Sequence, residues 1–396
     1  MLGPGEPGSL TSGLGKAADE ISQYLADYTY LTIVQPDNLD SLDAIENNIS
    51  LSKQKISIDD FSDFNVISEI SKINVAASIS PYWSDQNASR LETKEIKSHP
   101  LFDQLQDVSK DIVKVTERIN HDVIYAHDWI TFRAAIDIKA KYKKPLVLHV
   151  HSLDYDRNCG KSKSWVFDLE KEAFQKANVI ICVSEYSKAI IEKEYGVDPS
   201  KIQVIHNGYH QKPKTKTKSP FKEKVVLFVG RLTGQKGPTK FLEIAERVNE
   251  LYPNSRFIMA GEGDLYKSLI EAGAHSEIAN KFHITGYLDE PDLLKLYAMS
   301  DVYCMPSVSE PFGLTALEAA GAGLPLVISE NSGAAEVMTG ALLSKFDDSE
   351  TFAKHIVSIL KDEKKAIELA KINSALLPNL SWEKTNVQIL AILDSF

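Results

Sequence analysis

The sequence is poor in cysteine and in basic charge. Its 396 residues include 3 cysteines, and the scattered positions of Cys159, Cys182 and Cys304 lack the spacing of metal ligands. They predict buried thiols in a reducing compartment. Lys and Arg number 44 against 55 Asp and Glu, and the formal net charge is −11. Because a general nucleic-acid-binding protein is usually basic, this balance argues against that class.

Long apolar runs are also missing. No stretch approaches the roughly 18 consecutive apolar residues of a membrane span. No basic segment followed by an apolar one opens the chain, as it would in a secretion signal. We therefore expect a soluble, cytoplasmic protein with no integral membrane segment. Peripheral contact with a membrane stays open.

Short apolar runs alternate with longer helical segments along most of the chain. That rhythm indicates βαβ units and parallel sheets. A single core seldom grows beyond about 250–300 residues, so this length predicts two domains of the α/β class, each Rossmann-like and doubly wound. The expected strands are Leu31–Gln35, Val123–Ala126, Leu146–Val150, Val179–Val183, Lys201–Ile205, Val225–Val229, Arg256–Ala260, Phe282–Thr285, Val302–Met305 and Pro325–Ile328.

The segment "HNGYHQKPKTKTKSPFKEK" at 206–224 predicts the boundary between the two domains. Lys and Thr alternate there around two prolines, a composition typical of a solvated linker. We place the first domain at 1–208 and the second at 209–380. The lysines of this segment could instead form an anion-binding patch.

Residues 38–110 predict no definite element, because they are rich in Ser, Asp and Asn and have weak periodicity. Within them, "SISPYWSD" at 78–85 holds an aromatic pair. This pair fits either the core or the lining of a binding site, and we favour the core.

The strongest chemical signal lies in "VYCMPSVSEPFGLTALEAAGAGLPLVI" at 302–328. A strand leads into a loop, and a helix begins near Gly313 and Leu314. The free amides of a helix N-terminus suit a diphosphate or hydroxyl groups, and Gly313 lets a ligand approach the backbone. Glu310 in the loop and Glu318 in the helix could accept sugar and ribose hydroxyls. Alone, each Glu would also fit a capping or solvent-facing position.

A second signal is the loop "FVGRLTGQKG" at 228–237, which directly follows a predicted strand. Arg231 and Lys236 stand among its three glycines. A guanidinium binds diphosphate oxygens as a fork, and an ammonium adds a point charge. In an acidic protein this pair predicts an anion site, although two surface cations in a loop are the plain alternative.

The N-terminal "GPGEPG" at 3–8 matches the pattern G-x-G-x-x-G. We reject a dinucleotide site there, because no full strand precedes it and its prolines would spoil the turn into a helix. "SGLGK" at 12–16 is a better helix start. Gly13 and Gly15 could present backbone amides to a phosphate, unless this terminus is loosely ordered.

Polar side chains follow two predicted strands of the first domain. His127 and Asp128 end "IYAHDW", and His151 ends "LVLHVH". Ligands of doubly wound sheets collect at such strand ends. A lone histidine is more often a core residue, but two sites with the same placement favour function.

The segment Asp154-Tyr155-Asp156 imitates an Asp-x-Asp metal signature. Nothing nearby in the sequence completes a metal shell, so we assign no metal.

Two short turns follow strands of the second domain. "AGEGD" at 260–264 and "TGYL" at 285–288 could line a nucleotide base pocket through Gly261 and the backbone groups of Tyr287 and Leu288. Ordinary turns between strand and helix explain them nearly as well.

Together these motifs resemble the glycogen-synthase-like family of retaining glycosyltransferases, which have the GT-B fold and a Glu-x(7)-Glu pair. "GRLTGQKG", "AGEGD", "TGYL", "MPSVSEPFGLTALEA" and "SGAAEV" resemble the C-terminal half of that family. "AHDW", "HVHSLDYDR", "VSEYSK" and "VDPSKIQVIHNG" resemble the N-terminal half. The resemblance covers 120–396 well, 1–37 loosely and 38–110 hardly at all.

The resemblance implies two domains facing across a cleft, with the acceptor side on the first and a UDP-, ADP- or GDP-sugar on the second. It implies a helix at about 381–396 that packs back on the first domain, and chemistry that needs no metal or other cofactor. The resemblance implies that Arg231 and Lys236 bind the diphosphate and that Glu318 binds the ribose. It implies donor-sugar contacts for Glu310, for His151 and for the backbone of Phe312, Gly313 and Leu314. It also implies that Asp128 lies near the reacting centre and that Gly15 faces the donor phosphates.

The sequence departs from the family at its start. Only Met1 and Leu2 stand where a full strand is usual, and the family's double glycine is replaced by Ser12 and Gly13. We interpret this as a truncated or variant N-terminus, and it weakens the acceptor side of the resemblance.

We expect transfer of a hexose, first of all glucose, to a saccharide or other hydroxyl acceptor, as in polysaccharide biosynthesis, with no nucleic-acid partner. Two alternatives stay open: another GT-B enzyme, an epimerase or a phosphorylase-like enzyme, and a non-catalytic nucleotide-sugar binding protein. The base, the sugar, the acceptor and the oligomeric state are not readable.

Overall fold

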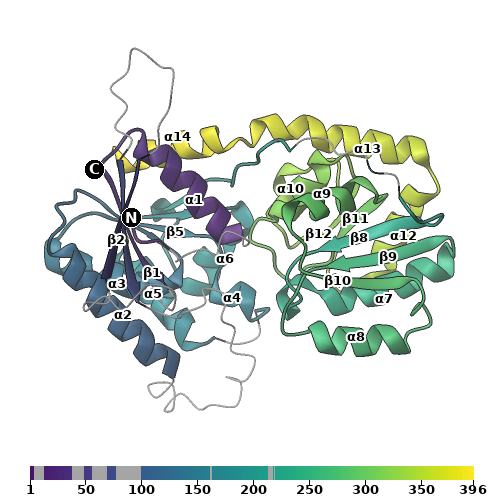
Figure 1. The fold of residues 1–396 in the computed structure, drawn as a ribbon, viewed down its shortest axis with the longest axis horizontal. Coiled ribbons are helices and arrows are strands. Elements are labelled where there is room, and N and C mark those ends of the chain that lie inside the picture. Colours follow the sequence, from purple (N-terminus) through teal and green to yellow (C-terminus); the bar gives the residue numbers. More distant parts are fainter. Residues whose placement is uncertain are drawn as a thin grey trace. The chain divides into compact units, whose positions relative to one another are not determined.

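A computed structural model describes residues 1–3, 13–37, 49–55, 69–76, 100–160, 163–212, 217 and 219–396. The chain divides into two compact units (Figure 1). The first contains Met1–Gly208 and Trp382–Phe396, and the second contains Tyr209–Ser381. Most of "GPGEPG", all of "SISPYWSD" and part of the lysine-rich segment lie outside the described residues.

The sheet of the first unit is parallel except at one edge. Strands β4, β5, β6 and β7 pair in that order and in parallel, β1 pairs in parallel with β3, and β2 lies antiparallel on β3. The strands are β1 (Leu31–Asp37), β2 (Ile49–Lys55), β3 (Glu69–Ala76), β4 (Ile124–His127), β5 (Leu146–Val150), β6 (Val179–Cys182) and β7 (Ile202–Val204).

Leu2 joins these two sets of strands into one sheet. It forms parallel bridges to Val34 of β1 and Ala126 of β4. The amide of Leu2 donates to the carbonyl of Tyr125 (2.7 Å), and the amide of His127 donates to the carbonyl of Leu2 (3.3 Å). The short N-terminal segment therefore occupies a central strand position. Because it runs parallel to β4, the chain leaves the sheet at the edge where β4 ends.

Helices cover both faces of this sheet, because strand residues alternate between two cores. Leu148 packs with α2, α3, α5 and α6, whereas Val147 packs with α1 and α14. Helices α1 and α14 lie side by side (Figure 1), and Asn386 Nδ2 donates to the carbonyl of Glu20 (3.2 Å). The helices are α1 (Gly13–Ala26), α2 (Pro100–Thr116), α3 (Trp129–Tyr142), α4 (Asp154–Arg157), α5 (Trp165–Lys176), α6 (Glu185–Tyr195) and α14 (Trp382–Leu393).

The second unit has a fully parallel sheet in the order β10-β9-β8-β11-β12-β13. Its strands are β8 (Lys224–Val229), β9 (Ser255–Ala260), β10 (Phe282–Gly286), β11 (Val302–Met305), β12 (Leu326–Ser329) and β13 (Leu342–Ser344). Its helices are α7 (Pro238–Leu251), α8 (Tyr266–His275), α9 (Glu290–Ala298), α10 (Leu314–Gly321), α11 (Ala334–Val337), α12 (Ser349–Leu360) and α13 (Glu363–Leu376).

This sheet is also covered on both faces. Phe228 and Cys304 pack with α7 and α12 in one core. Tyr303 points to the other face, where its hydroxyl donates to Thr315 Oγ1 of α10 (2.7 Å). Side-chain caps begin several helices: Ser164 and Ser184 in the first unit and Asp289, Asp348 and Asp362 in the second accept backbone amides of the first turn.

The expectation of α/β domains with parallel sheets is confirmed, and each expected strand is present within two residues of its expected bounds. Three strands were not expected, namely β2, β3 and β13. The sequences of β2 (ISLSKQK) and β3 (EISKINVA) mix polar with apolar residues. They lie toward one edge of the sheet, where an apolar run on both faces is not required.

Candidate active site

Four loops meet at the carboxyl edge of the second unit's sheet. The amide of Leu232, after β8, donates to the carbonyl of Glu262, after β9 (2.8 Å). The amide of Val308, after β11, donates to the carbonyl of Gln235 (2.9 Å). Parallel strands open their carboxyl ends to one crevice, which is where such sheets bind ligands. The loops carrying the predicted donor site therefore form one connected surface.

Gly261 allows the loops after β8 and β9 to approach each other closely. Its φ of +141° lies in a region that side chains rarely adopt, and a Cβ there would lie 1.9 Å from the carbonyl oxygen of Gly230. Its amide donates to the carbonyl of Gly286 (2.9 Å). A glycine is thus required for the loops after β8, β9 and β10 to touch.

The structure brings Lys236 and Glu310 together. Lys236 Nζ lies 2.5 Å from Glu310 Oε2, and only 6% of the Glu310 side chain is exposed. The backbone of Glu310 is held by its neighbours, since its amide donates to the carbonyl of Asn331 (2.9 Å) and its carbonyl accepts from Gly333 (3.0 Å). Arg231 lies in the same loop as Lys236, close to the end of β8. A cation and a carboxylate from two distant sequence motifs therefore share one place.

The N-terminus of α10 follows Glu310 closely in the chain. Gly313 caps the helix in the left-handed conformation, with φ +99° and no side-chain cap hydrogen bond. The predicted start of this helix is confirmed at Leu314. Phe312 is 3% exposed, so only its backbone is suited to reach a ligand. The first-turn amides of α10 have the polarity that binds anions and hydroxyls.

Glu318 is positioned by a residue that the sequence analysis missed. Tyr297 of α9 is buried, and its hydroxyl donates to Glu318 Oε2 (3.2 Å). Burial, followed by the nearby charge of Glu318, raises the pKa of Tyr297 well above its ordinary value, so the phenol stays a donor. In the sequence Tyr297 looks like any core aromatic of a helix.

The predicted base-pocket residues follow β10. The amide of Tyr287 donates to Glu262 Oε1 (3.3 Å), and the Tyr287 side chain is 55% exposed. This amide is therefore engaged by a carboxylate of the neighbouring loop. Leu288 follows it in the turn before α9.

Asp128 of the first unit is buried and its backbone is strained. It has φ 54° and ψ 171°, values that few residues other than glycine adopt. Its Oδ1 accepts from the amides of His151 (2.7 Å) and Ser152 (3.4 Å). Burial raises the pKa of the Asp128 carboxyl to about 7. Strain of this kind concentrates at functional sites, which supports the predicted role of Asp128.

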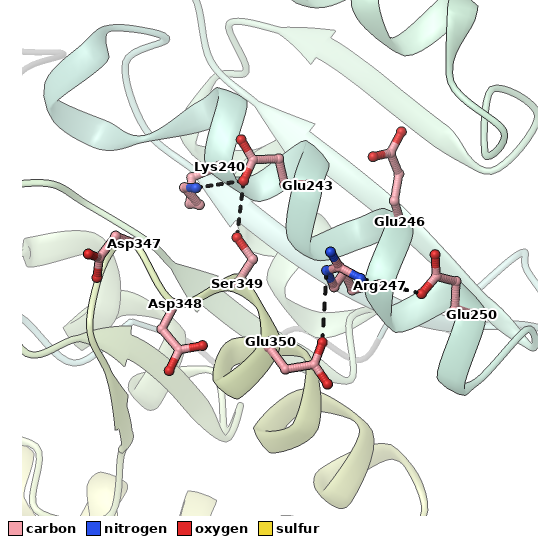
Figure 2. Close-up of a pocket in the computed structure, with 9 residues that line it drawn as sticks. All are labelled: Lys240, Glu243, Glu246, Arg247, Glu250, Asp347, Asp348, Ser349 and Glu350. Carbon is pink, nitrogen blue, oxygen red and sulfur yellow. Dashed lines mark hydrogen bonds and ion pairs between the residues drawn. The ribbon is translucent and has the colours of Figure 1, made fainter.

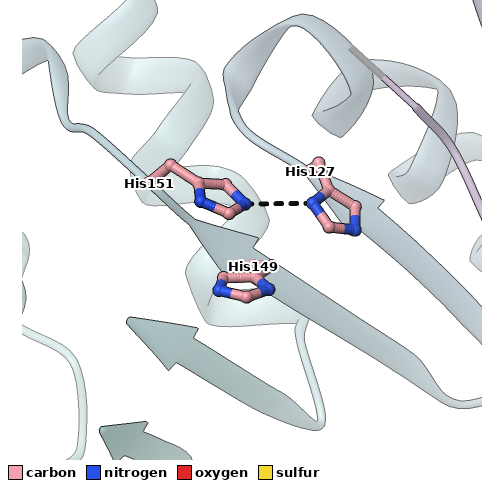
Figure 3. Close-up of side chains that lie close together, drawn as sticks. All are labelled: His127, His149 and His151. Atoms are coloured by element: carbon pink, nitrogen blue, oxygen red, sulfur yellow. Dashed lines mark hydrogen bonds between the residues drawn. The ribbon is translucent and has the colours of Figure 1, made fainter. Parts of the chain in front are cut away.

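Three histidines gather at the carboxyl ends of β4 and β5 (Figure 3). His127 lies opposite His149 in the strand register, and His127 Nδ1 is 3.0 Å from His151 Nε2. The hydroxyl of Tyr125 contacts His149 Nδ1 at 2.6 Å. Burial lowers the pKa of His151 to about 3 and those of His127 and His149 well below the ordinary value. All three imidazoles are therefore neutral near pH 7.

The turn after His151 is held by a buried charge network. Arg157 Nη2 lies 2.8 Å from Glu170 Oε1, and Glu170 also accepts from the amide of Asp154 (3.0 Å) and the hydroxyl of Tyr195 (2.5 Å). Asp154 in turn accepts from Ser164 Oγ (2.6 Å). Burial raises the pKa of Glu170 to about 8. Asp154 thus supports the fold, and Glu170 is a supporting residue that no motif indicated.

The remaining predictions for the first unit concern Gly15 and the cysteines. Gly15 is buried in the first turn of α1. Cys182 and Cys304 are buried, but Cys159 is only half-buried, so the expectation of a buried thiol is wrong there. The reason is local: Cys159 and Gly160 form a tight turn with positive φ that ends α4 at the surface.

A cavity of about 580 Å³ in the second unit is lined by other residues than these loops supply (Figure 2). The cavity lies between residues of α7 and residues at the start of α12. Six carboxylates line it beside two cations, and Arg247 reaches Glu250 and Glu350 at 3.8 Å each. None of the predicted site residues lines it. Its charge opposes a diphosphate, so we do not assign the donor to it.

Comparisons with known proteins agree with the fold. Residues 211–374 match the family described as "Glycosyl transferases group 1", and residues 81–211 match "Glycosyltransferase Family 4". A glycogen synthase of Mycobacterium tuberculosis is 31% identical over 229 residues, which is 55% of this chain and 54% of that protein. An uncharacterized glycosyltransferase of Methanocaldococcus jannaschii is 31% identical over 236 residues, which is 55% of this chain and 60% of that protein.

A solved structure extends the likeness to the whole fold. HepE of Anabaena in complex with UDP and glucose has a TM-score of 0.70 and 17% identity, over 100% of this chain and 99% of that chain. Two parallel α/β units with site loops at the carboxyl edges define the GT-B class of fold.

Over residues 81–211 and 211–374 the chain is similar to glycosyltransferases, and its fold is of the GT-B class. Its matched region spans about half to three fifths of the two relatives. Among the described residues, no helix has the length and apolarity to cross a membrane.

Proposed function

We propose that this protein is a retaining glycosyltransferase that moves a hexose from a nucleotide diphosphate sugar to a saccharide or other hydroxyl acceptor. The observation that carries the proposal is the contact between Lys236 and Glu310 beside the N-terminus of α10. A cation for phosphate and a carboxylate for sugar hydroxyls stand together in a protein whose net charge is −11. The family match and the UDP and glucose in the HepE structure support the same donor class.

In this proposal the second unit stabilises the leaving group. Arg231, Lys236 and the first amides of α10 neutralise the diphosphate as its bond to the anomeric carbon breaks, which lowers the barrier at the site of developing charge. Glu310 accepts hydrogen bonds from donor-sugar hydroxyls. Glu318, held by Tyr297, accepts hydrogen bonds from the ribose hydroxyls.

The first unit contributes neutral or weakly acidic groups. His151 contacts the donor sugar as an uncharged hydrogen-bond partner, and Asp128 lies near the reacting centre. The acceptor hydroxyl attacks on the face that the diphosphate leaves, and the departing phosphate takes its proton. This route gives retention and uses no metal.

The test is isothermal titration with UDP, ADP and GDP and with their glucose or mannose conjugates. One nucleotide series is expected to bind, and Glu318→Ala should weaken it by about tenfold or more, as loss of hydrogen bonds to a charged group does. Glu277→Ala, an exposed carboxylate of the same unit, is the matched control. Absence of binding by every nucleotide would overturn the donor site. Product formation without an acceptor would favour an epimerase.

A further inference from the structure

A direct hydrogen bond joins the rings of His127 and His151 (Figure 3). The two nitrogens are 3.0 Å apart, and the ring planes differ by 14°. His127 is fully buried and His151 is 8% exposed. This separation fits an N–H···N hydrogen bond between two imidazoles that face each other.

Only one proton can occupy this bond, because both rings are neutral. A neutral imidazole has one N–H donor and one acceptor nitrogen. Either His151 Nε2–H donates to His127 Nδ1, or His127 Nδ1–H donates to His151 Nε2. The bond therefore couples the tautomers of the two residues.

The first arrangement is the more stable one. The Nε2–H form is the preferred tautomer of a free neutral histidine, and the first arrangement places both rings in it. The second would force both into the Nδ1–H form. The neighbouring His149 is compatible with this arrangement, because the Tyr125 hydroxyl lies 2.6 Å from His149 Nδ1 and donates to it when the proton of His149 is on Nε2.

The consequence is an unused acceptor on His151. Its Nδ1 carries a lone pair and is buried, and, like His127 Nε2 and His149 Nε2, it has no hydrogen-bond partner among the described residues. A buried acceptor without a partner costs free energy, and such atoms in native proteins usually meet a ligand, an ion or water. A hydroxyl group supplies the donor that this nitrogen lacks.

A shared metal ion fits the cluster less well. The rings of His149 and His151 stack, with centroids 4.1 Å apart and planes 19° from parallel. An ion lies in the ring plane of each imidazole that binds it, so two stacked rings cannot both bind one ion without turning.

We propose that His127 is a positioning residue that holds His151 in the Nε2–H tautomer, so that Nδ1 of His151 accepts a hydrogen bond from a ligand hydroxyl. The identity of that hydroxyl as one of the donor sugar rests on the proposed function. The assignment of the tautomer does not rest on the proposed function.

The first test is nitrogen NMR of the full chain with 15N-labelled histidine, treated with a chelator. In the wild type we expect His151 to show a protonated Nε2 and a bare Nδ1 between pH 5 and pH 8. His127→Asn should keep this pattern, because its Oδ1 replaces the acceptor Nδ1. His127→Leu should change it, because the Nε2–H loses its partner. A protonated Nδ1 in the wild type would overturn the proposal, as would an unchanged pattern in His127→Leu.

The second test uses the reaction and separates this proposal from the function. His127→Leu should lower kcat by about tenfold, the effect of one hydrogen bond, and His127→Asn should recover most of it. Affinity for the free nucleotide should not change, because none of the contacts proposed for it involves His127 or His151. Equal losses in both variants would overturn the positioning role. If no donor supports transfer, the proposed function fails and the NMR result still decides the tautomer. If His127→Leu does not fold, the wild type and His127→Asn decide it.

Discussion

The carboxyl of Asp128 makes a prediction at the scale of one residue. Its pKa is about 7 in the folded protein against an ordinary value of 3.8, so folding binds a proton between these values. Relative to Asp128→Asn, the wild type should therefore lose stability as the pH rises from about 4 to about 7, and the difference should be constant above that. The expected change is a few kcal/mol, at roughly 1.4 kcal/mol per pKa unit.

Urea unfolding of both proteins across this pH range measures the difference. The pKa of His151 is lowered to about 3 from 6.5, so its contribution is lost as the pH falls through that window. The contribution of His151 to stability is present in both proteins, so it cancels in the difference between them. Parallel curves for wild type and Asp128→Asn would show that the carboxyl titrates normally.

Lys236 makes a prediction about chemistry. Lys236→Ala should lower kcat by about 100-fold or more, because the leaving diphosphate loses a preorganised cation. Arg231→Ala should act in the same direction. Lys240→Ala is the control, since this lysine of the same unit pairs with Glu243 in the cavity of Figure 2. Steady-state kinetics measure the effect, and an unchanged kcat in both loop variants contradicts the leaving-group role.

The contact between α9 and α10 makes a prediction at the scale of elements. Tyr297→Phe removes the hydroxyl that holds Glu318, so the donor KM should rise about three- to tenfold with little change in kcat. Tyr303→Phe is a matched control, because its hydroxyl bonds Thr315 rather than Glu318. Equal effects of the two variants would show that a lost buried hydroxyl, rather than the ribose contact, explains the result.

Elements are also where sequence reasoning succeeded best. Strands β5 and β11 were expected at their observed bounds, because each is a short apolar run that is buried along its length. The start of α10 was expected because Gly313 and the acidic loop mark it locally. Strands β2 and β3 were missed, because their pairing rather than their composition makes them strands.

The path of α14 makes a prediction at the scale of the whole molecule. This last helix belongs to the first unit, where Ile389 is fully buried against α1. Ile389→Ala should cost about 2–5 kcal/mol of unfolding free energy in that unit. Val387→Ala, which is 50% exposed, should cost little. Chemical denaturation with a probe in each unit measures both, and equal losses would contradict the packing of this helix.

The sequence by itself determined the class of the fold and the residues of the donor motif. Apolar period, turn residues and the Glu310 to Glu318 spacing are local properties, and they persist whatever the rest of the chain does. Only the tertiary structure decided which of these residues meet. The contact of Lys236 with Glu310, of Tyr297 with Glu318 and of His127 with His151 each joins separate elements. Parallel strand order and burial set these contacts, and neither is encoded in any one segment.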